Sequence, residues 1–452
     1  MWLDGLGKTG KIYFIGIGGV SMSALAKLLR CTGYQVSGSD AVCNESVESL
    51  KNTGVFVRTG EFGGEVCEAL KNAETVVYTD AISKKDGELL YAQKSGKKIL
   101  KRGELLSLVS KKFSYSTAVA GSHGKTTCTA MCAHILKAVR APFAAHIGGE
   151  DSRFGNFYIN GFEHFLTEAC EYKKNLLALT PDRAIVLNVD LDHMECYEGE
   201  ADLVDTFRTF CQKSKTAFIC ADDKRSEKLG DFPTFGIKNP FADYRAVDLK
   251  QTGERYSFTL HEYGRELCRI RLSCVGFCNI YNALAAFAAM RSYGFDAQEI
   301  VQGIEDFRAV KRRYEEIGKY KGGSFVCDYA HHPKEILSTI ATAQKATKKR
   351  LFVVFQPHTY SRTKLLMEEF VKVLSPIRNL VVYQTYAARE KYDEAGSAQT
   401  LSARVGSIYA ENVVALKTFL EKTLKDGDEV LFLGAGDIYY VAKFVLKELN
   451  NE

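Results

Sequence analysis

The chain has 452 residues, of which 46% are apolar and 25% charged, and its length predicts about three domains. Sixty Lys and Arg residues against 55 Asp and Glu leave a small positive charge, without a basic stripe, so nucleic acid is not an expected partner. Apolar runs stop well short of the roughly 20 residues that span a bilayer, and no membrane insertion is expected. Thirteen scattered cysteines without a Cys-x-x-Cys pair, behind a start unlike a signal peptide, predict free thiols and a cytoplasmic location.

Residues 1–104 are predicted to form a Rossmann-like domain, because short β-branched runs at 11–15, 34–38, 55–57 and 75–78 alternate with helical stretches. The first run ends in a glycine-rich turn. Gly16 and Gly18 match the dinucleotide fingerprint there, but Ser21 replaces its third glycine. Such a turn at a helix N-terminus suits any diphosphate, and Asp40 after the second run suits a sugar hydroxyl. A nicotinamide cofactor and a nucleotide-sugar therefore both remain open.

Residues 105–311 are predicted to form a second α/β domain around a shortened P-loop. Gly121 and Gly124 let backbone N–H groups approach phosphate, Lys125 supplies a charge, and Thr126 suits Mg²⁺. The loop is short because Val119 stands where the eight-residue P-loop pattern has glycine. Further strands are expected at 165–167, 184–189 and 217–220, followed by a hairpin at 256–272 and a helix at 279–293.

Two strands of this second domain end in groups that suit a cation. Glu168 is the first candidate to bind Mg²⁺ held by ATP phosphates, and His193 is the second, as a ligand of another cation or an orienting group. A helix-capping role for His193 stays open. Asp190 and Asp192 are compatible with simple turn caps, and Glu171 with a solvated neighbour.

Residues 312–452 are predicted to form a third α/β domain with strands at 324–327, 350–355, 379–383 and 429–433. Arg312 and Arg313 stand at its start and suit either the γ-phosphate of a nucleotide or a surface cluster. Loops at 328–333 and 355–364 follow two of the strands and carry histidines. Ligands of open α/β sheets bind at such strand ends. The turn at 434–438 is either a ligand loop or a tight turn.

Taken in order, these segments resemble the Mur ligase family over nearly the whole chain. The resemblance rests on residues 16–24, 121–127, 188–193, 276–286, 312–314, 328–333, 355–358 and 434–438. It implies a three-domain α/β fold: a Rossmann-like N-terminal domain, a central P-loop ATP-binding domain and a Rossmann-like C-terminal domain. It also implies ATP-dependent ligation of L-alanine to the carboxylate of UDP-N-acetylmuramate through an acyl phosphate, for peptidoglycan precursor synthesis. The cofactors implied are ATP and either Mg²⁺ or Mn²⁺, in a monomer or weak homodimer.

The resemblance also implies roles for individual residues. The implied catalytic residues are Lys125, Glu168, His193 and Arg313, and the implied metal ligands are Thr126, Glu168 and His193. The implied ATP ligands are Gly121, Ser122, His123, Gly124, Lys125, Thr126, Thr127, Asn279, Asn282, Arg312, Arg313 and Asp328. The UDP-sugar ligands are Gly16, Gly18, Gly19, Val20, Ser21, Ser39 and Asp40. The amino-acid ligands are His331, His332, His358 and Arg362.

The chain departs from the family pattern at three positions and leaves three alternatives open. Cys170 stands where the pattern has Asp, Cys278 where it often has His, and Thr359 where it often has Arg. The first alternative is a related ligase that attaches a recycled peptide to the same nucleotide-sugar. The second is a nicotinamide-dependent oxidoreductase, and the third is a non-catalytic protein that keeps a nucleotide fold.

Overall fold

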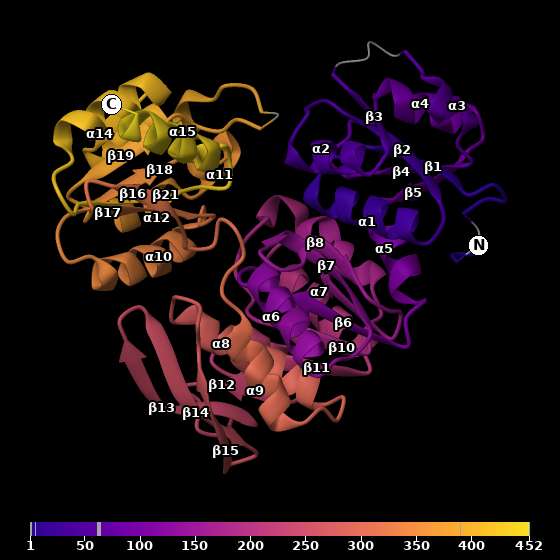
Figure 1. Ribbon diagram of the computed structural model, residues 1–452, viewed down its shortest axis with the longest axis horizontal. Coiled ribbons are helices and arrows are strands. Elements are labelled where there is room, and N and C mark those ends of the chain that lie inside the picture. Colours follow the sequence, from indigo (N-terminus) through magenta and orange to yellow (C-terminus); the bar gives the residue numbers. More distant parts are fainter. Residues whose placement is uncertain (1, 5, 61–64, 389, 452) are drawn as a thin grey trace. The chain divides into compact units, whose positions relative to one another are not determined.

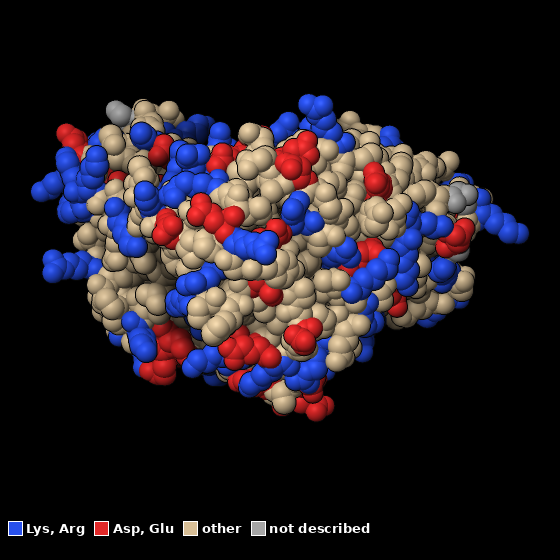
Figure 2. All heavy atoms as spheres, turned by 90° about the horizontal axis from the view of Figure 1, so that it is seen from below, with Lys and Arg blue, Asp and Glu red and all other residues tan. Residues whose placement is uncertain are grey.

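The computed structural model describes residues 2–4, 6–60, 65–388 and 390–451 (Figure 1). The chain divides into two compact units. The first consists of Met1–Leu249, Phe258–Ile270 and Asn279–Phe307, and the second of Lys250–Ser257, Arg271–Cys278 and Arg308–Glu452. Within the described ranges, no helix is both long and apolar enough to cross a bilayer. Basic and acidic side chains are interspersed on the face drawn in Figure 2, as the nearly balanced composition predicts.

The N-terminal part of the first unit is a parallel sheet in the order β3-β2-β1-β4-β5. Its strands are β1 Lys11–Ile15, β2 Gln35–Asp40, β3 Phe56–Thr59, β4 Thr75–Tyr78 and β5 Lys98–Lys101. Its helices are α1 Val20–Cys31, α2 Glu45–Asn52, α3 Glu68–Asn72, α4 Gly87–Lys94 and α5 Arg102–Ser110. Alternate β1 residues point to opposite faces: Phe14 packs with α1, α2 and α5, and Tyr13 with α3 and α4. The doubly wound arrangement predicted for this part is confirmed.

The central sheet has ten strands in the order β15-β14-β13-β12-β11-β10-β6-β9-β7-β8. The first five in sequence are β6 Tyr115–Ala120, β7 Phe143–Asp151, β8 Gly155–Ile159, β9 His164–Glu168 and β10 Arg183–Val186. The others are β11 Thr216–Cys220, β12 Thr234–Gly236, β13 Tyr244–Thr252, β14 Arg255–Glu262 and β15 Arg265–Arg271. The helices are α6 Lys125–Ala138, α7 Glu200–Lys213, α8 Cys278–Arg291 and α9 Ala297–Asp306. The sequence did not predict β7 and β8, which pair antiparallel at the edge of the sheet.

β6, which leads into the P-loop, lies between β9 and β10 and is parallel to both. The carboxyl ends of these three strands therefore meet at one edge of the sheet, where a doubly wound fold binds its ligands. β10 ends at Val186, three residues earlier than predicted, so Asn188 and the following residues form a loop at that edge.

The C-terminal sheet has the order β16-β17-β21-β18-β19-β20 and is parallel except for β16. Its strands are β16 Glu315–Tyr320, β17 Gly323–Asp328, β18 Leu351–Phe355, β19 Leu380–Tyr383, β20 Ile408–Ala410 and β21 Glu429–Leu433. Its helices are α10 Pro333–Ala346, α11 Tyr360–Leu365, α12 Met367–Leu374, α13 Ala398–Val405, α14 Val413–Thr423 and α15 Ile438–Asn450. Helices α14 and α15 pack on one face, and α10, α12 and α13 on the other.

Candidate active site

The P-loop connects β6 to α6 through two glycines with left-handed backbone angles. Gly121 has φ 137° and Gly124 has φ 85°, a region that side chains disfavour. A Cβ atom on Gly124 would lie 2.7 Å from Oδ1 of Asn282. The Nδ2 atom of Asn282 donates to Asn279 Oδ1 at 2.8 Å. Thr126, in the first turn of α6, is buried. The helix N-terminus, Thr126 and the two predicted asparagines thus meet at this loop.

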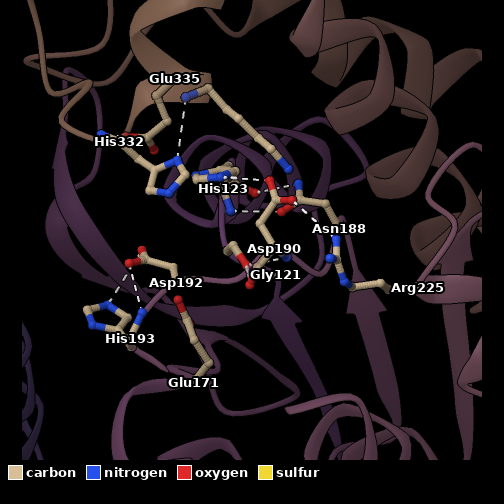
Figure 3. A network of polar contacts seen from close by, with 12 residues as sticks. Gly121, His123, Glu171, Asn188, Asp190, Asp192, His193, Arg225, His332 and Glu335 are labelled. Atoms are coloured by element: carbon tan, nitrogen blue, oxygen red, sulfur yellow. Dashed lines mark hydrogen bonds and ion pairs between the residues drawn. The ribbon is translucent and has the colours of Figure 1, made fainter. Parts of the chain in front are cut away.

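The loop that follows β10 fixes the shape of the P-loop (Figure 3). Asn188 accepts from the His123 N–H at 2.9 Å and donates to the His123 carbonyl at 3.1 Å. The Ser122 hydroxyl accepts from the Asp190 N–H at 2.8 Å, and the His123 ring lies 3.1 Å from the Asp190 carboxylate. Each of these contacts joins a residue of the P-loop to a residue of the loop after β10, so together they hold the two loops against each other.

Lys125 is the charged group of the P-loop, and its ammonium donates to a buried carboxylate. The Lys125 Nζ to Glu171 Oε1 distance is 2.9 Å, and the ammonium also donates to the carbonyls of Gly121 and Ser122. Burial acts to lower the pKa of Lys125, but the charge and hydrogen bond of Glu171, together with the charges of Cys170 and Glu168, outweigh burial and raise the pKa. The interpretation of Glu171 as a solvated neighbour is wrong, since this residue is only 3% exposed.

Glu171 also belongs to a group of possible metal ligands. One ligand atom each of Glu171, Asp192 and His193 lies within 4.8 Å of the others, and Figure 3 shows the three side chains gathered together. No described residue forms a hydrogen bond with the buried Oε2 atom of Glu171. Two carboxylates so close to each other repel unless a cation lies between or beside them, and oxygen and imidazole ligands suit a divalent cation. The donor set therefore fits a metal ion.

Glu168, the first candidate from the sequence, has a different main contact. Its Oε1 atom accepts from the Gly148 N–H at 2.7 Å, and a Cβ atom on Gly148 would lie 2.4 Å from the same oxygen. Glu168 contributes to the raised pKa of Lys125, so its charge acts on the P-loop. Among the described residues, the possible metal ligands grouped with His193 are Glu171 and Asp192, and Glu168 is not one of them.

The glycine-rich turn after β1 is held in place by hydrogen bonds to the end of β2. The N–H groups of Gly16 and Ile17 donate to the Ser39 carbonyl at 2.8 and 3.0 Å, and the Gly18 N–H donates to Asp40 at 2.8 Å. Gly16 has φ 79°, and a Cβ atom on Gly18 would lie 2.9 Å from the Asp40 carboxylate. The turn therefore requires glycine at both positions.

The remaining predicted nucleotide-sugar residues differ in what they present. Gly19 and Val20 are exposed at the start of α1, and no side chain caps that N-terminus. The Ser39 side chain is buried and its hydroxyl donates to Glu88, so it cannot face a ligand. Ser39 instead stabilises the turn through its backbone carbonyl, which accepts from the N–H groups of Gly16 and Ile17. Asp40 braces the turn through Gly18, which the sequence did not predict.

In the second unit, the two arginines have different surroundings. Arg312 donates to the Gly436 carbonyl at 2.6 Å, and its guanidinium lies over the Tyr329 and Tyr439 rings. It thereby fixes the 434–438 turn. The guanidinium of Arg313 lies 5.0 Å from the centre of the Tyr329 ring. Arg313 is accordingly the better candidate for a nucleotide phosphate.

Asp328 ends β17 and is bound by the backbone. Its carboxylate accepts from the N–H groups of Tyr314 and Ala330, each at 2.8 Å. Burial raises the pKa of Asp328, and the charge of Arg313 opposes that rise. Asp328 therefore holds the start of the third domain and the loop before α10 in place.

The predicted amino-acid ligands form two groups. The Nδ1 atom of His358 accepts from the Arg362 guanidinium at 3.2 Å. The His358 ring stacks on Tyr386 and lies 5.9 Å from the ring of His331. These three predicted residues lie together. His332 is instead the N-cap of α10: it is buried, and its Nδ1 atom accepts from the Lys334 N–H at 3.4 Å. A capping role, which the sequence did not predict, thus explains His332.

Sequence reasoning also missed residues that build the site. Asn188 was part of a predicted strand, although Asn commonly forms side-chain bonds to backbone in loops, which is a usable signal. Gln356 follows β18, is 1% exposed, and holds the start of α15 by accepting from the Ile438 N–H at 3.0 Å. His146 lies on β7, a strand that was not predicted, and no local signal identified it.

Comparison with known families agrees with this arrangement. The chain matches three family models in succession: "Mur ligase family, catalytic domain" over residues 11–114, "Mur ligase middle domain" over 119–290, and "Mur ligase, glutamate ligase domain" over 312–436. Full-length relatives are more than 30% identical, as given below. The chain belongs to the Mur ligase family, and the resemblance inferred from the motifs is confirmed.

Three similar curated proteins are each named UDP-N-acetylmuramate--L-alanine ligase. The protein of Clostridium beijerinckii is 35% identical, over 97% of this chain and 98% of its own. That of Clostridium novyi is 36% identical over 97% of each chain. That of Acetivibrio thermocellus is 34% identical, over 97% of this chain and 96% of its own.

Solved structures agree with the fold. The crystal structure of UDP-N-acetylmuramate-alanine ligase MurC from Thermotoga maritima has a TM-score of 0.84 and 26% identity, covering 98% of this chain and 99% of its own. A murein peptide ligase from Psychrobacter arcticus has a TM-score of 0.76 at 21% identity, covering 98% of this chain and 99% of its own. This second likeness extends to the fold alone. The three-domain α/β architecture predicted from the sequence is confirmed.

Proposed function

We propose that this enzyme joins L-alanine to the carboxylate of UDP-N-acetylmuramate with consumption of ATP, a step of peptidoglycan precursor synthesis. The substrates are proposed from the name shared by relatives that are 34–36% identical over almost the whole chain. The chemistry is proposed from the site. Its central observation is the buried Glu171 carboxylate, which pairs with Lys125 of the P-loop and lies beside Asp192 and His193.

The reaction requires a carboxylate to be made into an acyl donor. A carboxylate oxygen of the nucleotide-sugar attacks the γ-phosphorus of ATP, the bond to the β-phosphate oxygen breaks, and ADP leaves. The neutral amine of L-alanine then attacks the acyl carbon. The bond to the phosphate oxygen breaks, the amine loses a proton, and an amide and inorganic phosphate are formed. Negative charge collects at the phosphates throughout, so positive groups and N–H donors there favour the reaction.

Residues of the P-loop are proposed to bind the ATP phosphates. The N–H groups at the start of α6 point toward an anion, and Lys125 can move from its contacts with Gly121, Ser122 and Glu171 to a phosphate oxygen. Asn279 and Asn282 adjoin this loop and are proposed to lie on the nucleoside side. Arg313 and Asp328 of the second unit are proposed as further ATP residues, while Arg312 supports the 434–438 turn.

Mg²⁺ is the proposed metal, with Mn²⁺ as an alternative. Glu171, Asp192 and His193 would hold one ion, because their ligand atoms are close together and one Glu171 oxygen is otherwise unsatisfied. Thr126 and Glu168 remain proposed ligands near the phosphates. A bound Mg²⁺ would supply positive charge to the phosphate oxygens during transfer. Glu171 would then exchange its Lys125 contact for the ion, which frees Lys125 for phosphate.

The other substrates are proposed to bind at the two remaining sheets. The turn that contains Gly16, Gly18 and Gly19 would take the diphosphate of the nucleotide-sugar. His331, His358 and Arg362 would face the amino acid, with the Arg362 guanidinium suited to its carboxylate. The free thiols of the described chain support a reducing compartment, and we propose the cytoplasm. A monomer or weak homodimer remains a prediction.

One assay tests the proposal against its nearest alternative. Purified enzyme with ATP, Mg²⁺ and UDP-N-acetylmuramate is expected to release ADP when L-alanine is added, and much less with glycine, D-alanine or a tripeptide. A tripeptide that supports turnover while L-alanine does not would identify a peptide-recycling ligase instead. ATP binding without any turnover would indicate the non-catalytic alternative.

A further inference from the structure

His146 is a buried histidine that links two parts of the first unit. It lies on β7, is 3% exposed, and is paired in register with Thr167 of the neighbouring strand β9. One ring nitrogen, Nδ1, lies 3.0 Å from the Thr167 hydroxyl. The other, Nε2, lies 2.8 Å from the hydroxyl of Ser21, in the first turn of α1. The ring thus bridges the central sheet and the helix that follows the glycine-rich turn.

The direction of each hydrogen bond follows from counting protons. The Thr167 hydroxyl donates its single proton to the Glu168 carbonyl at 3.1 Å, so it accepts from His146 Nδ1–H. A neutral imidazole carries one proton, and Nε2 therefore accepts the Ser21 hydroxyl proton. Arg102 in turn donates to the Ser21 oxygen at 3.2 Å. The chain of donors runs without conflict from Arg102 to the Glu168 carbonyl.

Charge and burial favour the neutral His146 ring that this series of hydrogen bonds requires. Burial, together with the positive charge of Arg102, lowers the pKa of His146 to about 4. The ring is therefore neutral near pH 7. Since the Ser21 hydroxyl proton is directed to His146, Ser21 can offer only its backbone N–H, and not its hydroxyl proton, to a bound phosphate.

Both ends of the bridge lie beside groups of the proposed reaction. Ser21 follows the turn that is proposed to bind the nucleotide-sugar. Thr167 directly precedes Glu168, and the Gly148 N–H, two residues after His146 on the same strand, donates to the Glu168 carboxylate. β7 therefore holds Glu168 through Gly148 and the start of α1 through His146. A nearby Asn156 on β8 donates to the Val20 carbonyl at 2.9 Å and reinforces this docking.

We propose that His146 is a positioning residue that sets the glycine-rich turn of the nucleotide-sugar domain against the strand that ends at Glu168. It acts through Ser21 and Thr167 and touches no reacting atom. The inference rests on the proposed function, because it assumes that the two ends serve one reaction. Its consequence is that the two ring nitrogens have separable tasks, one in nucleotide-sugar binding and one in the chemistry at Glu168.

Two substitutions separate these tasks. His146→Asn places an amide near the Nδ1 position and keeps a partner for Thr167, but it does not reach Ser21. His146→Gln reaches the Nε2 position and keeps a partner for Ser21, but it gives up Thr167. We expect His146→Asn to raise the Kd for UDP-N-acetylmuramate roughly three- to tenfold, as for the loss of one hydrogen bond, with kcat nearly retained. We expect His146→Gln to retain this Kd and to lower kcat by a similar factor.

The measurements are titration calorimetry of UDP-N-acetylmuramate and steady-state ADP release, with ATP KM recorded for every variant. The matched control is His134→Asn, because His134 is also buried and bonded, to Asp151 at 3.2 Å, but touches neither Ser21 nor Thr167. It is expected to leave both quantities within about twofold of the wild type, within the spread expected for distant substitutions. A purely structural role for His146 predicts that the Asn and Gln variants change Kd and kcat together, and that outcome would refute the proposal.

Further variants keep the test decisive. If His146→Asn does not fold, Ser21→Ala removes the same bond from the other side and is expected to raise the same Kd. Where both single variants fold, the effects of His146→Asn and Ser21→Ala on this Kd are expected to be less than additive in the double variant, and full additivity counts against the bridge. Calorimetry with UDP alone separates the hypothesis about His146 from the proposed ligase function, because UDP binding requires no turnover. A wild type that binds UDP but does not use L-alanine contradicts the proposed function, while the Kd difference between variants still tests His146.

Discussion

Replacement of Glu171 by Gln is the most direct test of the site, because the sequence favoured Glu168 and the structure brings Glu171 to Lys125. The change keeps the side-chain shape but removes the charge that pairs with the ammonium at 2.9 Å. The Glu171 and Lys125 side chains are 4% and 16% exposed, so solvent screens the pair only weakly. Removing one partner of a buried pair costs 3–5 kcal/mol in general, and the carbonyls of Gly121 and Ser122 still hold Lys125 here, so we expect about 2 kcal/mol.

The functional effect is expected on the metal ion. Loss of one carboxylate from the group with Asp192 and His193 should raise the Mg²⁺ concentration for half-maximal ADP release at least roughly tenfold, since even supporting residues of a metal site contribute that much. Mg²⁺ titrations of ADP release and thermal unfolding of Glu171→Gln measure the two effects. Asp202→Asn is the matched control, because Asp202 pairs with Lys174 on the surface. Its Mg²⁺ dependence should equal that of the wild type.

A comparison with Glu168→Gln decides which carboxylate holds the ion. If Glu168→Gln shifts the Mg²⁺ dependence and Glu171→Gln leaves it unchanged, the reasoning from the cluster is wrong and the sequence prediction was better. If both variants shift the Mg²⁺ dependence, two sites bind ions. One would consist of Thr126 and Glu168, and the other of Glu171, Asp192 and His193.

Three further predictions concern the P-loop, the Glu168 contact and pH. Lys125→Ala should abolish ADP release yet leave the Kd for UDP-N-acetylmuramate within about twofold, because the two ligands use different sheets; calorimetry showing both lost in a folded variant would refute that division. Gly148→Ala should lower kcat, because its Cβ atom would lie 2.4 Å from the Glu168 carboxylate, and an unchanged kcat would show that this contact is dispensable. Because the pKa of His146 is lowered to about 4, the unfolded chain binds the proton first as pH falls. The contribution of His146 to the free energy of unfolding is then fully present above about pH 6.5. It falls by up to ~3 kcal/mol toward pH 4. Unfolding measured from pH 4 to 7 should show a weaker slope for His146→Gln, and an equal slope would exclude this histidine as its source.

The sequence predicted most of the parallel strands of the three domains, because their apolar runs end in glycine or polar residues, but it missed the parallel strands β5, β12 and β20. β4 and β21 agree residue for residue with the expected runs. It failed where strands are mixed in character: β5 reads Lys-Ile-Leu-Lys, and β7 and β8 contain glycine and polar residues among the apolar ones. Such strands are stabilised by pairing with other strands, which their own residue pattern does not report.

The site shows the same division between local and tertiary information. The glycines of the P-loop and of the turn after β1 could be predicted because positive φ and close backbone approach demand glycine locally. The surroundings of Ser39 could not be predicted, because Glu88 contacts its side chain only in the folded chain. The capping role of His332 did have a local signal that the sequence analysis did not use, namely Pro333 at the start of α10 and Glu335 three residues after the cap. The choice between Arg312 and Arg313 likewise depended on the Gly436 carbonyl, 124 residues further along.

The sequence by itself determined the family, the fold class and the order of the phosphate-binding and cation-binding segments, because these depend on residue types at fixed local spacing. Tertiary structure alone decided which carboxylate meets Lys125 and His193, and that β7 links Ser21 to Thr167 through His146. The physical reason is that hydrogen bonds and ion pairs act over about 3 Å, whereas the residues that form them here come from separate strands and loops. Only the pairing of β6 with β9 and β10, and of β7 with β9, brings those atoms to that distance.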